Sequence, residues 1–428
     1  MLNPIVYAVP VFVLLMAAEF LWSRRRGEAV YRAADTVASL SAGISSQLAG
    51  VFTKLMTVGL YTLVWQHGAL LEWPLDAVWA WLLALLLYDF LYYWNHRLGH
   101  EVAILWAAHV VHHSSEEYNL STALRQTSTG FLFSWIFYLP MALLGVPPLM
   151  FVVVGLIDLL YQFWVHTRLV GKLGWFDRVF VSPSNHRVHH GQNDYCLDRN
   201  YGGILILWDR LFGTFVEERE GEPIVYGVLG PLRSWSVWQA NTRNYAELWR
   251  DARLADNWRD KLTIWFRRPA WRPAAAERLA PKPRPDLARF VRYAPPLPPG
   301  LPLYGLLQLA LLLLLGVYFL AVEPRLSLQL GLAAAAGLVL SLVLLARLLE
   351  DPVAAVGGER LRLLGLGGAA GAQLWQGQVL LAPGTALWAL SLLAALAGLA
   401  LLPRLLRATA TKKPSAGDSG SKELGQPL

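Results

Sequence analysis

The sequence predicts an all-α, polytopic integral membrane protein with a helical cap of histidine boxes on its cytoplasmic face. Hydrophobic residues make up 55% of the 428 residues and charged residues only 16%, which is more apolar surface than a soluble domain of this size can bury. The 19 tryptophans and 16 tyrosines suit aromatic belts at the membrane interfaces. Nine of the ten histidines lie between residues 96 and 190, so one region is expected to carry the chemistry.

Eight apolar runs come close to the ~20 residues that a helix needs to cross a bilayer. We expect these runs to span the membrane at residues 4–22, 40–65, 77–95, 129–147, 149–165, 301–322, 327–348 and 380–402. Pro147 and Pro148 should separate the fourth run from the fifth, which makes these two runs a hairpin.

Basic residues indicate the side of the membrane on which each connection lies. The positive-inside rule places Arg24–Arg26 and the polar stretch 166–300 in the cytoplasm. Eight spans that start outside would also end outside. The basic residues near the C-terminus place that end of the chain inside instead: Arg404, Arg407, Lys412 and Lys413. One span is therefore miscounted, and the sequence does not show which one.

Composition divides the chain into four regions. They are a catalytic domain at 1–265, a Pro-rich linker at 266–300, C-terminal transmembrane helices at 301–403 and a disordered tail at 404–428. The C-terminal spans consist of Leu, Ala and Gly with few polar groups, which favours a role in packing or oligomerisation over a second active site. The basic, aromatic stretch 231–272 is expected to lie on the membrane surface as an amphipathic helix.

The single cysteine, Cys196, excludes an intrachain disulfide, a Cys-rich zinc site and a four-cysteine iron–sulfur cluster. Any metal must therefore be held by nitrogen and oxygen. The net charge of +7 is modest and shows no basic stripe interleaved with aromatic residues, so a nucleic-acid partner is not expected. A dinucleotide-binding fingerprint is also missing, and we therefore expect a separate electron donor.

Three histidine boxes follow one another along the chain: "HRLGH" at 96–100, "HVVHH" at 109–113 and "HRVHH" at 186–190. In a helix over 77–100, His96 and His100 lie one turn apart and can ligate one metal. His166 is a ninth candidate, at the end of a span. Asp89 and Asp158 lie inside spans, where an acid is costly unless partnered, so both are candidates for the chemistry.

Eight or nine imidazoles exceed the three or four ligands that one zinc ion takes, and they suit two adjacent ions. Imidazole accepts zinc, iron or copper, so the donor type alone leaves the metal open. Crowded imidazoles would repel one another if they were protonated, whereas neutral imidazole is a metal ligand. His67 lies outside this group and is interpreted as an interfacial residue.

The boxes resemble those of the membrane fatty acid hydroxylase / sterol desaturase superfamily. The flanks "HHSSEEYNLSTALRQ" (112–126) and "NYGGILILWDRLFGTF" (200–215) are similar to the alkylglycerol monooxygenase branch and its bacterial relatives. This resemblance implies a non-haem di-iron centre of two Fe²⁺/Fe³⁺ ions that uses O₂ to hydroxylate a C–H bond of a lipid. The implied iron ligands are His96, His100, His109, His112, His113, His166, His186, His189 and His190.

The resemblance also implies the surroundings of the enzyme. The lipid substrate would be a fatty acyl, sterol or alkyl-ether chain within the bilayer. Ether cleavage would imply tetrahydrobiopterin as the reductant, and bacterial relatives leave another external reductant open. The expected location is a bacterial inner membrane, with the boxes facing the cytoplasm.

Further residues receive roles beside the boxes. The expected catalytic carboxyl groups are Glu116, for which Glu117 is the alternative, together with Asp89 and Asp158. Contacts to a polar lipid head group are expected from Tyr118, Asn119 and Arg125, where Arg125 could instead form a loop ion pair. Orientation of the histidines through their ring N–H groups is expected from Asn185, Asp209 and Gln162.

Three alternatives stay open from the sequence. A desaturase of the same superfamily would use the same boxes, and its product would carry a double bond instead of an added oxygen. A histidine-rich metal transporter would also collect imidazoles near a membrane, but it should line its spans with polar residues. A scaffold that has lost its activity is disfavoured because the boxes are complete.

Overall fold

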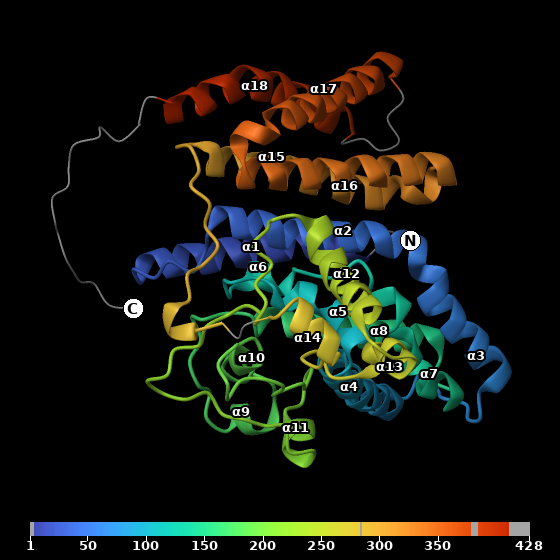
Figure 1. Ribbon diagram of the computed structural model, residues 1–428. Helices are drawn as coiled ribbons and strands as arrows, with labels where there is room; N and C mark the ends of the chain where they lie inside the picture. Colours follow the sequence, from blue (N-terminus) through green and yellow to red (C-terminus); the bar gives the residue numbers. More distant parts are fainter. Residues whose placement is uncertain (1–3, 283–284, 378–383, 411–428) are drawn as a thin grey trace.

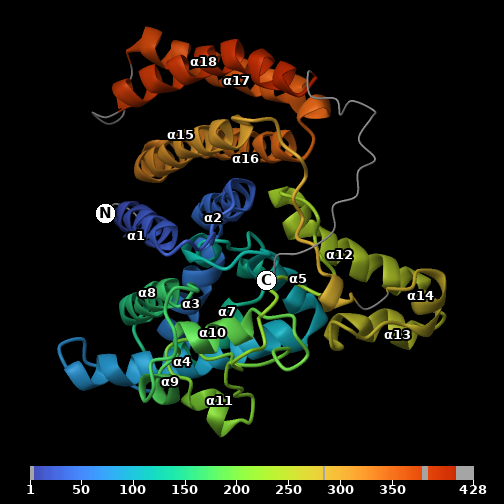
Figure 2. The same ribbon diagram turned by 90° about the vertical axis from the view of Figure 1, so that its left-hand side faces the viewer.

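The computed structural model describes residues 4–282, 285–377 and 384–410, and in this part of the chain it forms helices without a β-strand. Two isolated bridges, Phe180–Leu205 and Gly191–Tyr226, join loops. The helices stack in layers, with α17 and α18 outermost, α15 and α16 next, then α1 and α2, and the histidine-bearing helices beneath them (Figures 1 and 2). The all-α, multi-pass prediction is confirmed, whereas the cytoplasmic orientation stays a prediction.

The N-terminal region begins with two long helices, α1 (Pro4–Arg25) and α2 (Ala33–Lys54). A π-helical turn at Leu55–Gly59 joins α2 to α3 (Leu60–Gly68), and the two helices meet at an angle of 49°. The expected span 40–65 is therefore a bent pair of helices. Because the sequence stays apolar through the bend, hydropathy alone predicts a single span there.

The histidine region follows with a pair of longer helices and several short ones. Their bounds are α4 (Val78–Glu101), α5 (Ala103–His113), α6 (Leu120–Ala123), α7 (Trp135–Leu143), α8 (Pro148–Trp164), α9 (Phe176–Val179), α10 (Pro183–His189) and α11 (Leu207–Leu211). The expected hairpin break at Pro147 and Pro148 is present. However, α7 has nine residues, or about 14 Å, so it cannot cross a bilayer core of about 30 Å. The predicted span 129–147 is wrong because turns on both sides limit its α-helix to Trp135–Leu143.

The stretch after the boxes forms α12 (Val237–Leu254), α13 (Trp258–Thr263) and α14 (Ala274–Leu279). Trp238, Trp249 and Trp258 are exposed along α12 and α13, which suits the predicted membrane-surface helix. The expected linker then returns to the histidine region, where the main-chain N–H of Tyr293 donates to Glu116 at 2.6 Å. The linker is thus hydrogen-bonded to the histidine region at Tyr293.

Four helices form the C-terminal bundle: α15 (Leu301–Val322), α16 (Leu328–Glu350), α17 (Pro352–Gln376) and α18 (Gly384–Ala410). The sequence did not predict α17, because its charged residues lower its hydropathy. The end of α18 lies beside the start of α15: a Cβ on Gly300 would lie 3.0 Å from Leu405. Helix α17 does not have the hydropathy of a membrane span, so the side of the membrane on which the chain ends stays a prediction.

Four described helices are long and apolar enough to span a membrane, namely α1, α15, α16 and α18, and the bent pair α2–α3 is a fifth candidate. The expected tail began at residue 404, but α18 continues to Ala410, so the first part of that prediction is wrong. Residues 411–428, like the start of the predicted span at 380–383, lie outside the described residues.

The largest hydrophobic core joins the two halves of the chain. Val37, Ile44 and Leu48 of α2 are buried together with leucines of α15 and α16. A side chain moved in the C-terminal bundle can therefore displace α2, which also packs against the histidine region through α6.

Candidate metal centre

Nine buried or half-buried histidines gather into two clusters, which we call the cage. Within each cluster, one ring nitrogen per residue lies within 4.8 Å of all the others. The first cluster contains His96, His100, His109, His113 and His189, and the second contains His112, His166, His186 and His190. The rings of His113 and His190 stack with centroids 4.2 Å apart, so the clusters adjoin. The structure brings together all nine predicted ligands and leaves His67 exposed on α3.

Facing ring nitrogens lie at the spacing that ligands of one ion adopt. In the first cluster, Nε2 of His113 lies 3.1 Å from Nε2 of both His100 and His109. In the second, Nε2 of His166 lies 3.2 Å from that of His112 and 3.1 Å from that of His186. Two nitrogens held about 2.1 Å from one ion at about 90° would be about 3.0 Å apart. The donor set therefore fits a metal ion in each cluster.

Main-chain carbonyl groups orient four of these rings. Nδ1 of His96 lies 2.8 Å from the carbonyl oxygen of Tyr201, and Nδ1 of His189 lies 2.9 Å from that of Arg199. An Nδ1–H that donates to a carbonyl leaves Nε2 as the lone-pair nitrogen. Among the described residues, Nε2 of His96 and of His189 is buried without a hydrogen-bond partner. A buried lone-pair nitrogen of this kind fits the role of a metal ligand.

The second cluster is oriented in the same way. Nδ1 of His112 lies 3.0 Å from the carbonyl oxygen of Arg125. Nδ1 of His166 lies 2.8 Å from the main-chain carbonyl oxygen of Gln162, one helical turn earlier. Gln162 thus serves the predicted orienting role, but through its backbone. Carbonyl acceptors carry no sequence signal, so sequence reasoning could not find the residues that supply them.

The surroundings keep the imidazoles neutral. Burial lowers the pKa of His112 to about 4. Burial, together with the neighbouring imidazoles, also holds the pKa of His186, His189 and His190 well below the ordinary value. Neutral imidazole offers a lone pair, so these groups are in the ligating form near pH 7.

Helix α10 presents the third box. Its capping box pairs Ser182 with Asn185: the main-chain N–H of Ser182 donates to the Asn185 side chain at 3.1 Å, and the reverse bond is 3.4 Å. These bonds satisfy the first N–H groups of a helix only seven residues long. Asn185 was expected to hold a histidine ring. Instead, Asn185 stabilises the start of the helix that carries His186 and His189 and is followed by His190.

Two carboxylates clamp the loop 199–206, whose carbonyls orient His96 and His189. Asp209 accepts from the N–H groups of Tyr201 and Gly202, both at 2.7 Å. Asp89 accepts from the main-chain N–H of Ile204 at 2.7 Å and from the Trp208 indole. Neither carboxylate belongs to the cage. The predicted contact of Asp209 with a histidine is therefore wrong, and both acids position the loop instead.

Asp158 lies on the other side of this loop. Gln162 donates to Asp158 at 2.5 Å and accepts from the Tyr92 hydroxyl at 2.7 Å. A Cβ on Gly203 would lie 2.6 Å from Asp158 and 2.9 Å from Asp89, so only glycine lets the loop pass between the two carboxyl groups. Asp158 is outside the cage, and its predicted catalytic role has no contact with the ring nitrogens to support it.

Glu116 and Glu117 are held away from the cage by other groups. Glu116 accepts the Tyr293 main-chain N–H, and Glu117 pairs with the guanidinium groups of Arg32 at 2.5 Å and Arg168 at 3.5 Å. Both clusters consist of imidazole in the described residues. The expectation that Glu116 is a carboxylate ligand is not met by this geometry.

The three predicted head-group contacts are buried and have structural partners. The Tyr118 hydroxyl donates to the carbonyl of Val165 at 2.9 Å, and its ring stacks on His166. Asn119 caps α6. Arg125 is 3% exposed and donates to the carbonyl of Val111 at 2.8 Å. Tyr118 and Arg125 therefore support the cage from behind, and a lipid head group cannot reach them.

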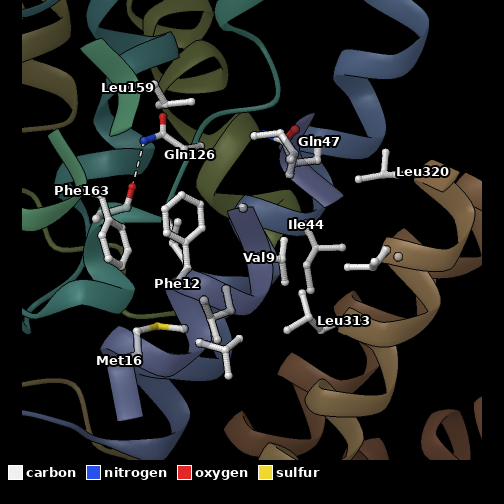
Figure 3. A pocket seen from close by; sticks show the side chains of 18 of the residues that line it. Val9, Phe12, Met16, Ile44, Gln47, Gln126, Leu159, Phe163, Leu313 and Leu320 are labelled. Carbon is white, nitrogen blue, oxygen red and sulfur yellow. Dashed lines mark hydrogen bonds between the residues drawn. The ribbon is translucent and has the colours of Figure 1, made fainter. Parts of the chain in front are cut away.

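An apolar pocket adjoins the second cluster (Figure 3). It contains about 1050 Å³ of empty space, part of which opens to the surroundings. Its walls come from α1, α2, α8 and α15, and apart from His112, His166 and three glutamines they are apolar. Figure 3 shows Phe12 of α1 beside Phe163 of α8, and it shows Ile44 and Leu313 on the opposite side of the view. The ring of Phe12 lies 4.4 Å from that of Phe163.

These features define a class: a multi-pass membrane protein with two adjoining clusters of histidines beside an apolar pocket. A fatty acid hydroxylase family model matches residues 81–214, which contain all three boxes. The alkylglycerol monooxygenase of Xenopus tropicalis is 40% identical over 324 residues, 76% of this chain and 71% of its own length. That of Danio rerio is 44% identical over 268 residues, 62% of this chain and 59% of its own length.

A more distant relative is the ornithine lipid hydroxylase of Rhizobium tropici, 28% identical over 232 residues, 52% of this chain and 68% of its own length. No solved structure matches. The chain belongs to the fatty acid hydroxylase family, in the branch of the alkylglycerol monooxygenases. The predicted family is thereby confirmed, and these relatives support an oxidoreductase.

Proposed function

We propose that this chain is a membrane-bound, di-iron, O₂-dependent oxygenase that hydroxylates a C–H bond in the alkyl chain of a lipid. The observation that carries the proposal is the junction of cage and pocket: His112 and His166 belong to the second cluster and also line the apolar pocket. A hydrocarbon chain in this pocket would reach the cluster without crossing water.

Two iron ions suit the cage because it has five nitrogen donors in one cluster and four in the other. Iron supplies the redox chemistry with O₂ that zinc cannot supply. The chain's own residues would hold the ions, orient four of the rings through carbonyl acceptors and exclude bulk water by burial. Ring nitrogens that face one another cannot all be hydrogen-bond donors and acceptors in turn, so a shared metal ion is the role that suits them best.

The substrate class follows from the relatives and from the pocket. Two of the relatives are named alkylglycerol monooxygenases and one an ornithine lipid hydroxylase. Among the fatty acyl, sterol and alkyl-ether chains, we therefore favour the alkyl chain of a glycerol ether. The metal-transporter alternative requires a polar path, whereas the pocket lining is polar only at two histidines and three glutamines.

The reductant comes from outside the chain in this proposal. Tetrahydrobiopterin or another diffusible donor would supply the electrons, because no electron-carrying motif is present in the sequence. We place the cage at the cytoplasmic face, where a soluble reductant would reach it. Location in a bacterial inner membrane stays a prediction, since the relatives at 40–44% identity are animal proteins.

The test combines metal content with product analysis. Full-length protein in detergent is loaded with Fe²⁺ without oxygen and then given ¹⁸O₂, a reductant and an alkyl glycerol. We expect label in the lipid product. His186→Ala should lose both iron and product, and His67→Ala is the matched control because His67 is an exposed histidine outside the cage. A folded, iron-loaded protein that forms only a double bond would replace the hydroxylase proposal with a desaturase.

A further inference from the structure

Helix α15 of the C-terminal bundle forms one wall of the pocket. Four of its residues line the cavity, at the spacing that places side chains on one face of a helix. They are Leu313, Gly316, Val317 and Leu320. Figure 3 shows Leu313 and Leu320 opposite the α1 and α8 residues. The pocket is therefore open on this side without the bundle.

Close packing on α2 sets the distance of this wall. A Cβ on Gly316 would lie 3.4 Å from the Ile44 side chain, so glycine lets the two helices approach while adding nothing to the cavity. Ile44 lines the pocket as well. The width of the pocket beside α2 is thus defined by small and branched residues that face one another.

A buried polar group holds the opposite face of α15. Arg362 of α17 donates to Glu359 at 2.6 Å and to Gln308 of α15 at 2.7 Å. The hydroxyl of Tyr304, also on α15, donates to Glu359. These four residues, which we call the α15–α17 cluster, are all buried. Because a charged pair accepts few alternative registers in an apolar bundle, the cluster fixes the position of α15 along and around its axis.

The length of the pocket suits an extended chain. Helix α1 lines it from Ile5 to Met16, eleven residues apart, which corresponds to about 16 Å along the helix. The residues that line the pocket are apolar apart from the three glutamines, His112 and His166. The site lacks the charged groups that a phosphate or ammonium head group would require.

We propose that the alkyl tail of the lipid substrate lies along α15, and that Val317 and its neighbours on this face select the length of that tail. This inference rests on the proposed function for the reaction but adds a specificity determinant in a region without metal ligands. The reacting carbon lies near His112 and His166, and the tail runs from there between α1 and α15. The C-terminal bundle is then part of the substrate site as well as of the membrane anchor.

A pair of substitutions on one helix tests this. Val317→Trp fills the pocket, whereas Leu314→Trp adds the same bulk on the exposed side of α15, where Leu314 is 49% exposed. We expect Val317→Trp to lower kcat/KM for a hexadecyl glycerol by about tenfold or more, since a pocket rejects excess methylene groups by this margin. For an octyl glycerol the loss should be within about twofold. Leu314→Trp should leave both values unchanged.

A binding measurement separates this inference from the proposed reaction. A hexadecyl lipid with a photoreactive group at its tail end is crosslinked to the iron-loaded, full-length protein, and the labelled peptide is identified by mass spectrometry. Labelling within 313–320 in the wild type, lost in Val317→Trp, supports the tail site even if no product is formed. Labelling elsewhere, or equal chain-length profiles for the two tryptophan variants, would overturn it.

Discussion

The cage and the α15–α17 cluster are both buried polar groups, but their partners differ. In the cage, imidazoles face imidazoles, and Nε2 of His96 and His189 lacks a partner among the described residues. In the α15–α17 cluster, the cation Arg362 meets the anion Glu359 through two of its nitrogens. Opposite charges that pair with each other serve the fold, whereas lone-pair nitrogens that converge suit a cation from outside the chain. This difference separates a site from a structural support, although both interrupt apolar surroundings.

The largest effect should follow removal of the metal. Iron-free protein should have no oxygenase activity. Its free energy of unfolding should fall by about 4 kcal/mol relative to protein with Fe²⁺ at about 1,000 times its Kd, because an ion that binds only the folded state stabilises it. Thermal denaturation in detergent, with and without iron, measures the change. Identical melting curves would mean that the folded protein gains no stability from iron, which would contradict a metal site in the cage.

Breaking the α15–α17 cluster should cost stability but not iron. Arg362→Ala leaves Glu359 buried without a counter-charge, and the expected loss is about 3–5 kcal/mol. The double variant Glu359→Leu/Arg362→Met removes both charges and should recover most of that loss. Denaturant titration with iron analysis on each variant checks both points. A double variant as unstable as the single one would show that the cluster does more than pair its own charges.

Asp209→Asn should weaken the cage through the loop 199–206. An amide can accept fewer of the N–H bonds from Tyr201 and Gly202, so the carbonyl that orients His96 should shift. We expect about a 10–100-fold loss of iron affinity, seen by titration and as a change in the spectrum of the bound iron. Asp256→Asn, at a surface ion pair, is the control. Unchanged affinity and spectrum in Asp209→Asn would contradict the clamp.

The smallest expected effect is at Gly43. A Cβ there would lie 2.3 Å from the carbonyl oxygen of Leu124, which adjoins the Arg125 carbonyl that orients His112. Gly43→Ala should therefore destabilise the protein by about 1–3 kcal/mol. Gly50→Ala on the same helix meets no atom within 4 Å and should be neutral or stabilising. Equal melting temperatures for the two variants would show that α2 can shift without cost.

The sequence predicted the parts of the site whose signal lies in residue type and spacing. Nine histidines at helical spacing indicated a shared centre, and the structure places them together in two clusters. Their role as ligands stays a prediction. The acids and amides did not take the predicted roles: Glu116 accepts from the distant Tyr293 N–H, while Asp158 and Asn185 bond to their near neighbours Gln162 and Ser182 and not to a histidine ring.

The features of the structure that the sequence did not predict were missed for physical reasons. The carbonyls of Arg125, Arg199 and Tyr201 orient rings, yet a carbonyl is present in every residue and leaves no pattern to read. Helix α17 was missed because its charged residues, such as Glu359 and Arg362, lower its hydropathy. The pocket wall also leaves no pattern to read, since α15 begins about 110 residues after the last box and its contact with α1 and α2 arises from packing.

The most direct test of the account is the number of irons that one chain binds. Full-length protein is loaded with Fe²⁺ without oxygen, freed of excess metal and analysed for iron and protein in the same sample, beside His113→Ala and His67→Ala. The account predicts two irons per chain in the wild type and in His67→Ala, and a loss in His113→Ala, whose ring lies where the clusters adjoin. A well-folded wild type that binds one iron or none under these conditions would contradict the two-metal cage.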